Sequence, residues 1–185
     1  MKLEKPKQVV LACVAVMLFL MVGTAAAQGY IGAGAGITTM DLCDDLSGIG
    51  LTSCDDEDTG MKIFGGFKFN PNFGLEASWV DLGEVSATGP GGTATGEVDG
   101  FGLAAVGMIP LSEKWGLFGK VGAYMWDGTV SGPGGSVSDD GTDIMFGGGV
   151  SWTLTKRLGL RAEFERFDID GDDVDFISIG AQFNF

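Results

Sequence analysis

Histidine is absent from the 185 residues of this sequence. Because imidazole is the usual general base of serine and cysteine hydrolases and a common zinc ligand, its absence excludes those enzymes and histidine-based zinc sites. Basic residues are also few, since 11 Lys and Arg stand against 25 Asp and Glu and the formal net charge is −14. A protein that binds nucleic acid needs a basic surface to displace counterions from the phosphates, so we expect no nucleic-acid partner.

The first apolar run is short. It covers residues 9–22, fewer than the roughly 20 residues that a membrane-spanning helix needs. Three lysines precede it and residues 25–27 are all alanine, which together are typical of a secretory signal peptide that is cleaved before Gln28. We therefore predict that residues 1–27 are a signal peptide and that residues 28–185 form one exported domain. An uncleaved inner-membrane anchor is the alternative.

Cysteine is scarce, and the exported domain keeps only Cys43 and Cys54. An exported chain meets an oxidising compartment, so we expect these two residues to form a disulfide. Closing so short a loop would stabilise the fold by about 3 kcal/mol in the chain-entropy model. The alternative is a metal site with two thiolates, but the segment lacks the third and fourth soft ligands that such a site needs. We therefore predict no metal site and no cofactor.

After Gln28 the chain shows no convincing helical periodicity, and eight runs alternate between apolar and polar residues, as β-strands do. Short turns alternate strictly with longer polar connections at residues 39–58, 84–94, 128–141 and 168–172. This layout predicts an all-β fold, an eight-stranded antiparallel up-and-down transmembrane β-barrel with both termini on the side of the short turns. The predicted strands are residues 29–38, 59–69, 73–83, 95–109, 115–127, 142–154, 158–167 and 173–185.

One face of each predicted strand is apolar. In the third strand Phe73, Leu75 and Trp79 share a face, and Glu76 and Ser78 share the other. A soluble, lipocalin-like barrel would turn the apolar face inward, and this is the alternative. The polar faces are so rich in Gly and Ser that they suit a compact interior, and aromatic residues, among them Trp126, gather near both strand ends like two interfacial girdles. We therefore predict that the apolar face meets lipid.

The last predicted strand carries the most specific pattern. Ile177, Ile179 and Phe183 alternate toward a C-terminal Phe185, similar to the signal by which outer-membrane barrels are handed to the barrel assembly machinery. Residues 30–36 also look like the first strand of such a barrel. The exported domain thus resembles the small outer-membrane β-barrel family typified by the OmpA transmembrane domain.

This resemblance implies a Gram-negative outer membrane, with extracellular loops and periplasmic termini. It also implies passage through the periplasm with chaperones, and an environment of outer-membrane lipid and lipopolysaccharide. Proteins of the OmpA type usually continue into a periplasmic peptidoglycan-binding domain. This sequence stops at the eighth strand, so the resemblance does not carry tethering to the cell wall over to it.

Charged residues on the predicted inner face are the first candidates for a functional site. Glu76, Lys120, Arg161 and Glu163 lie about four to six residues from their short turns, with Glu165 one layer above. Buried charges must be paired, so we expect an ion-pair cluster that fills the lumen, as the resemblance also implies. The alternative is that the pairs exchange partners and open a narrow polar path. Eight strands leave room for little more than side chains, which argues against a general diffusion pore.

Acidic residues crowd two of the predicted extracellular loops. Carboxylates are the ligands that divalent cations such as Ca²⁺ prefer, and shared cations could also join them to lipopolysaccharide phosphates. Asp168, Asp170 and Asp172 do not have the spacing of an EF-hand, so we favour a solvated acidic surface and keep cation binding as the alternative. Two other loops repeat Gly-Pro-Gly-Gly at residues 89–92 and 132–135, which predicts hairpin tips with type II turns.

We therefore expect a non-enzymatic outer-membrane protein with a structural or surface-interaction role that depends on its acidic extracellular loops. A narrow channel for small or hydrophobic solutes is the alternative. A membrane-embedded enzyme is disfavoured, because the chain lacks the histidine that such activities commonly use as a base.

Overall fold

The structure is a computed structural model that describes residues 28–40 and 53–185. The predicted signal peptide, Cys43 and the acidic residues at positions 41, 44 and 45 lie outside the described residues. Of Cys54 only the backbone is described. Signal-peptide cleavage and the disulfide therefore stay predictions. Within the described ranges there is no helix long and apolar enough to cross a membrane.

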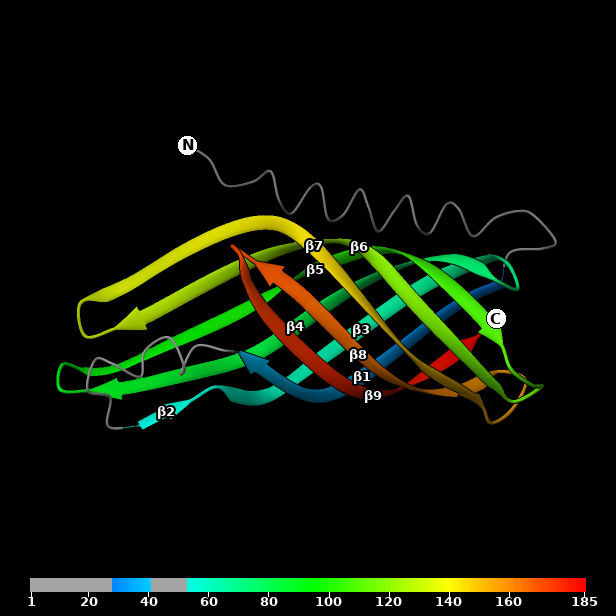
Figure 1. Cartoon of the computed structure of the whole chain (residues 1–185), viewed down its shortest axis with the longest axis horizontal. Helices are drawn as coiled ribbons and strands as arrows, with labels where there is room; N and C mark the ends of the chain where they lie inside the picture. Colours follow the sequence, from blue (N-terminus) through cyan, green and yellow to red (C-terminus); the bar gives the residue numbers. More distant parts are fainter. Residues whose placement is uncertain (1–27, 41–52) are drawn as a thin grey trace.

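Eight long antiparallel strands close into a barrel, which confirms the predicted fold (Figure 1). The sheet runs β4-β3-β1-β9-β8-β7-β6-β5, and pairing of β4 with β5 closes it. A ninth strand, β2, has three residues and pairs with the outer part of β4. The strands are β1 (Gln28–Met40), β2 (Ser53–Asp55), β3 (Glu57–Asn70), β4 (Phe73–Gly89), β5 (Gly92–Pro110), β6 (Trp115–Gly132), β7 (Gly135–Thr153), β8 (Leu158–Ile169) and β9 (Asp172–Asn184).

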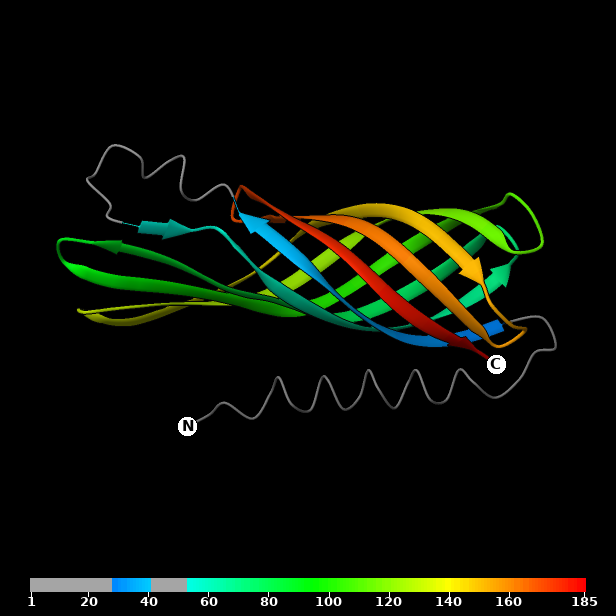
Figure 2. The same cartoon turned by 90° about the horizontal axis from the view of Figure 1, so that it is seen from below.

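The two ends of the barrel differ. Short turns join β3 to β4, β5 to β6 and β7 to β8 at one end, where β1 also begins and β9 ends (Figure 1). We call this the turn end. From the opposite, outer end the hairpins β4–β5 and β6–β7 project well beyond the barrel wall (Figure 2).

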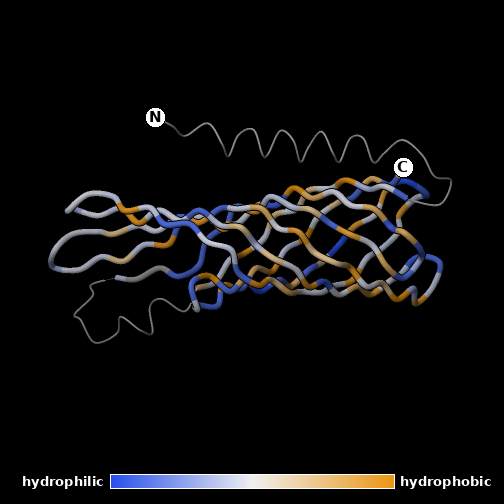
Figure 3. Tube along the Cα trace, turned by 90° about the horizontal axis from the view of Figure 1, so that it is seen from above, coloured by the Kyte–Doolittle hydropathy of each residue, from blue (hydrophilic) through white to orange (hydrophobic). Residues whose placement is uncertain are grey.

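The barrel has an apolar outside and a charged inside, as predicted. Outward-facing side chains such as Phe73, Ile177 and Ile179 are exposed, Ile179 to 74%. By contrast, Lys62 and Glu165 are almost completely buried inside. Apolar residues are spread over the barrel wall, while the projecting hairpins are paler (Figure 3). Water would not solvate such a wall favourably, so its exposed face suits the hydrocarbon of a bilayer.

Aromatic rings mark the turn end, where Trp115 stacks on Trp152 with ring centroids 5.5 Å apart. Near the outer end, the indole N–H of Trp79 donates to Asp99 at 3.2 Å. The prediction was wrong for Trp126, which is only 7% exposed and packs inside the barrel. Its position in β6 has the same parity as the inward-facing Lys120 and Tyr124, and that parity fixes its direction.

The barrel wall closes tightly between its first and last strands. A side chain at Gly36 would collide with the backbone carbonyl oxygen of Ile177 on β9. Gly34 and Gly180 approach the same seam closely. Glycine therefore allows β1 and β9 to pair in register from Tyr30 to Met40 and so to close the barrel.

Two predicted loops are strands for most of their length. Residues 84–94 and 128–141 form hairpins that continue the barrel strands, with pairing that reaches Gly89–Gly92 and Gly132–Gly135. The type II prediction for the tips was wrong, because the positive φ falls on Gly92 and Gly135, the fourth residue of each turn, and not on the third. A type I turn favours glycine at that fourth position.

The last of the predicted loops, residues 168–172, is also shorter than predicted. Ile169 pairs directly with Asp172, so Asp170 and Gly171 form a two-residue hairpin turn. Both have positive φ, 55° and 93°, which is the conformation that Asp-Gly adopts in a type I′ turn. The run of aspartates there made the segment look like an open loop, although the Asp-Gly pair itself predicts a tight turn.

Candidate functional site

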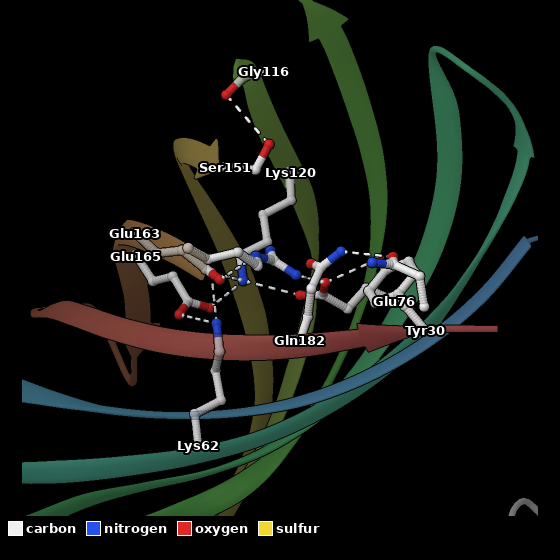
Figure 4. A network of polar contacts seen from close by, with 11 residues as sticks. Tyr30, Lys62, Glu76, Gly116, Lys120, Ser151, Glu163, Glu165 and Gln182 are labelled. Atoms are coloured by element: carbon white, nitrogen blue, oxygen red, sulfur yellow. Dashed lines mark hydrogen bonds and ion pairs between the residues drawn. The ribbon is translucent and has the colours of Figure 1, made fainter. Parts of the chain in front are cut away.

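The lumen holds a layer of charged side chains from β3, β4, β6 and β8 (Figure 4). Arg161 on β8 places its Nη1 2.6 Å from Glu76 Oε2 and its Nε 2.7 Å from Glu163 Oε1. Lys120 on β6 lies 2.8 Å from Glu163 Oε2 and 3.3 Å from Glu76 Oε1. The structure thus brings all four residues of the predicted lumenal cluster into one network.

Three further residues complete this layer. Lys62 on β3 places its Nζ 2.5 Å from Glu163 and 2.6 Å from Glu165. Glu165 also lies 2.5 Å from Lys120. The hydroxyl of Tyr30 donates to Glu76 at 3.0 Å. We call these seven residues the ion-pair layer.

The ion-pair layer is electrically balanced. Three carboxylates face three cations, and none of the six charged residues is more than 5% exposed. Leaving one of them without a counter-charge would cost several kcal/mol, so the equal numbers are what burial requires. Arg161 is also held between the rings of Phe64 and Phe118, at 4.5 and 4.3 Å from their centroids.

Sequence reasoning missed Lys62 and Tyr30. The signal for Lys62 was present, because alternation places it on the inner face of its strand and three inward carboxylates need a third cation. Tyr30 stands out in the sequence only as part of a first-strand motif. Its hydroxyl could not have been assigned to Glu76 without knowing how β1 and β4 are staggered.

Above the ion-pair layer, toward the outer end, lies an apolar layer that sequence reasoning did not predict. Tyr124 and Phe167 pack ring to ring with centroids 4.5 Å apart, and both are fully buried. The Tyr124 hydroxyl donates to the carbonyl of Val80 at 3.1 Å, so its polar atom is satisfied. The apolar layer consists of Val80, Leu82, Tyr124, Trp126, Met145, Phe167, Val174 and Phe176.

Below the ion-pair layer, at the turn end, the lumen opens into a cavity of about 240 Å³. Tyr30, Arg161, Ser151 and Gln182 contribute to its lining. The amino group of Lys68 lies over the Tyr30 ring, 5.6 Å from the centroid. The lumen is therefore a pocket with its mouth at the turn end and two packed layers between that pocket and the outer end.

At the outer end, aspartates on β8 and β9 are bound by neighbouring groups. Arg166 reaches Asp175 at 2.6 Å and Asp173 at 2.9 Å. Asp168 accepts a hydrogen bond from the backbone N–H of Gly171 at 3.0 Å. In the part of the chain that the structure describes, no three His, Cys, Asp or Glu side chains gather in a way that could hold a metal ion.

The residues of the predicted assembly signal lie along β9 and at its end. Ile177, Ile179, Phe183 and Phe185 are all exposed on the outer surface. The rings of Phe183 and Phe185 meet edge to face with centroids 5.6 Å apart, and the Phe185 N–H donates to the carbonyl of Gly29. The C-terminus is thus fixed to the start of the first strand.

The sequence of residues 10–185 matches the family described as outer membrane protein beta-barrel domain. Among curated proteins, the chain is 26% identical to outer membrane protein A of Klebsiella pneumoniae over 140 residues, which cover 68% of this chain and 41% of that protein. It is 25% identical to outer membrane protein A of Escherichia fergusonii over 140 residues, which cover 68% of this chain and 40% of that protein. The chain thus spans about two fifths of the length of these relatives.

Solved structures share the fold. The outer membrane protein OprG from Pseudomonas aeruginosa superposes with a TM-score of 0.60 at 16% identity, covering 88% of this chain and 98% of that one. Neisserial surface protein A gives 0.59 at 14% identity, with 88% and 99% covered. Ail, the attachment invasion locus protein of Yersinia pestis, gives 0.57 at 19% identity, with 86% and 97% covered.

Proposed function

Since the chain belongs to the outer membrane protein beta-barrel domain family, and is thus an outer-membrane β-barrel protein, we propose that it is a closed, non-enzymatic scaffold that presents an acidic surface-interaction region outside the cell. Both the ion-pair layer and the apolar layer fill the lumen with packed side chains. The observation that carries the proposal is the presence of two such layers in series, because water or a solute would have to disrupt both to cross.

The outer end supplies the second part of the proposal. Its hairpins carry many aspartates and glutamates, and Arg166 there already pairs with two of the aspartates. One structural neighbour, Ail, is an attachment invasion locus protein, and the shared architecture supports a surface role here too. Loss of the gene should then change surface binding or envelope permeability. A deletion strain unaltered in both would contradict the surface role.

Conductance in a planar bilayer tests the closed lumen. We expect the refolded barrel to show no discrete openings, because the side chains of both layers fill the lumen. A gel shift between unboiled and boiled samples first establishes that the barrel is folded, and a general porin in the same bilayer serves as the positive control. Openings that change when Glu76 is replaced by glutamine would contradict the proposal.

A narrow channel is the second candidate, and the cavity at the turn end is the observation that favours it. That cavity reaches Arg161, so a solute from the turn end could come into contact with the ion-pair layer. It would pass if the ion pairs rearranged and the side chains of the apolar layer moved aside. In this case Glu76→Gln would alter the conductance and Lys156→Gln, in an exposed turn, would not.

We also propose that residues 1–27 direct export and are removed, that Cys43 and Cys54 form a disulfide, and that periplasmic chaperones and the barrel assembly machinery receive β9 as their signal. The outward-facing Ile177, Ile179, Phe183 and Phe185 support the last point. Mass spectrometry of the protein from outer membranes is expected to give a chain that begins at Gln28. Reduction should add the mass of two hydrogens, and a chain that begins at Met1 or does not change on reduction would contradict the respective point.

A further inference from the structure

The outer half of β7 has a neighbour on one side only. β7 pairs with β6 along its whole length, from Trp115–Trp152 to Gly132–Gly135. Its pairing with β8 begins only at Met145, opposite Phe167, because β8 turns back at Ile169. Among residues 28–40 and 53–185, no strand pairs with residues 135–144 on the other side, and this edge projects from the outer end (Figure 1).

The opposite edge of the same projecting sheet is covered. Residues 53–55 of β2 pair with residues 86–88 of β4, so the outer part of β4 has neighbours on both sides. Between these edges, β5 and β6 stay paired up to Thr95 and Ser131. The four projecting strands therefore form one sheet whose open edge, within the described chain, is β7.

The open edge is long and regular. Its ten residues extend roughly 33 Å along the strand at about 3.3 Å per residue, and pairing with β6 runs through them without a bulge. It also contains no proline. Natural edge strands usually carry such interruptions to prevent another strand from pairing, and here only charged side chains serve that purpose.

The hydrogen-bonding groups at the edge can be assigned by position. The side-chain oxygens of Ser131 and Ser136 lie 2.9 Å apart, and those of Thr129 and Ser138 3.1 Å apart. Such closeness is typical of antiparallel pairs that do not hydrogen-bond to each other, so Ser136, Ser138 and every second residue direct their backbone groups away from β6. The N–H of Asp140, the next in this series, indeed donates to the side chain of Asp139.

Charge decides what can occupy the edge. Asp139 and Asp140 lie on successive positions and so point to opposite faces of the sheet. A second copy of β7 would place aspartates against aspartates, which is destabilising. Among the described residues the basic side chain at this end is Arg166, which pairs with Asp173 and Asp175. A strand rich in lysine and arginine would instead meet opposite charges on both faces.

From the open edge and its aspartates together, we infer that residues 135–144 of β7 bind an extended, lysine- and arginine-rich polypeptide segment as an added antiparallel or parallel strand. Backbone hydrogen bonds would supply affinity and the aspartates would select basic sequences. The exposed Val137, beside Val130 on β6, would add apolar contact. The inference rests on the proposed surface-interaction role and gives its partner a chemical class.

A synthetic ten-residue peptide that repeats Lys-Lys-Thr-Thr, and so places lysines on both faces of a strand, tests the inference by fluorescence anisotropy with the full barrel in nanodiscs. We expect saturable binding, at least tenfold weaker when every peptide nitrogen is methylated, because full methylation removes the backbone donors of both strand edges and keeps the charge. Ser138→Pro should weaken binding to a similar degree while the barrel still folds, since that N–H faces away from β6. Asp139→Asn with Asp140→Asn should also weaken binding, and Asp172→Asn, away from the edge, should not.

Equal binding of the methylated and unmethylated peptides would show attraction by charge alone and overturn strand addition. Absence of binding by the folded barrel would overturn the inference outright. A dimer in nanodiscs or detergent that Ser138→Pro disrupts would show that a second copy occupies the edge, which also overturns it. None of these outcomes bears on the closed lumen, which conductance tests separately.

Discussion

Replacement of Lys62 by methionine is expected to lower the free energy of unfolding by about 3–5 kcal/mol, because it leaves three buried carboxylates facing two cations. Lys62 is 1% exposed and contacts both Glu163 and Glu165, so water cannot replace the lost charge. Urea unfolding in lipid vesicles, followed by tryptophan fluorescence, measures the loss. Lys156→Met, in an exposed turn, is the matched control and should change little.

A double variant separates charge from packing in this experiment. Adding Glu165→Gln to Lys62→Met restores equal numbers of positive and negative charges in the ion-pair layer. We expect it to recover a substantial part of the lost stability, as double-mutant cycles of interacting residues do. If the double variant is as unstable as the sum of the two single variants, the residues act independently and the balance of charge is not what holds the layer together.

Replacement of Phe167 by alanine should cost about 3–5 kcal/mol, since it opens a cavity inside a packed apolar layer. Phe167 is fully buried against Tyr124. Phe164 on the same strand faces lipid and is 39% exposed, which makes Phe164→Ala a control of the same chemistry. Lipid can fill the space left at position 164, so that variant should lose much less.

The Phe167→Ala barrel should also show no discrete channel openings in a planar bilayer, because the ion-pair layer, which lies nearer the turn end, still fills the lumen. Discrete openings from this variant alone would mean that the apolar layer is the only barrier. If Phe164→Ala and Phe167→Ala lose equal stability, packing in the apolar layer stabilises the barrel no more than contact of a ring with lipid does.

The alternation of apolar and polar residues predicted much of this fold because the two sides of a barrel strand meet different surroundings. It placed Glu76, Lys120, Arg161 and Glu163 on the inner face, and distance from the short turns placed them at one depth. Lys62 obeys the same rule and could have been found by counting charges. The face to which a side chain points depends only on its position along the strand, and this is why the sequence alone reveals it.

The apolar layer could not be predicted in the same way. Met145 is a single exception on a polar and glycine-rich face of β7, and Val174 and Phe176 begin a face of β9 that continues with Ser178, Gly180 and Gln182. Only the stagger of the strands brings them to the level of Tyr124 and Phe167. Stagger depends on the closure of the whole barrel and is not encoded in any one segment.

The Gly-Pro-Gly-Gly tips predicted the two projecting hairpins, and the structure confirms them, but the length of their strands was missed for a related reason. Outside the membrane neither face of a strand meets lipid or a packed lumen, so residues 128–141 are mostly Gly, Ser, Thr and Asp, and Val130 and Val137 alone give too short an apolar pattern to mark a strand. Pairing there is maintained by continuous register and by the turns at the tips. Alternation of apolar and polar residues arises where the two faces of a strand meet different surroundings. It therefore does not reveal a strand that has water on both faces.

The uninterrupted register between β6 and β7 also limits how this surface can vary in nature. A single residue inserted into the barrel part of β6 would move the side chains beside it to the opposite face and would send Lys120 toward lipid. Insertions of matched pairs, one residue on each arm near the Gly-Pro-Gly-Gly tip, leave the membrane-embedded part unchanged. The hairpin can thus lengthen or shorten in even steps, while the barrel beneath it stays the same.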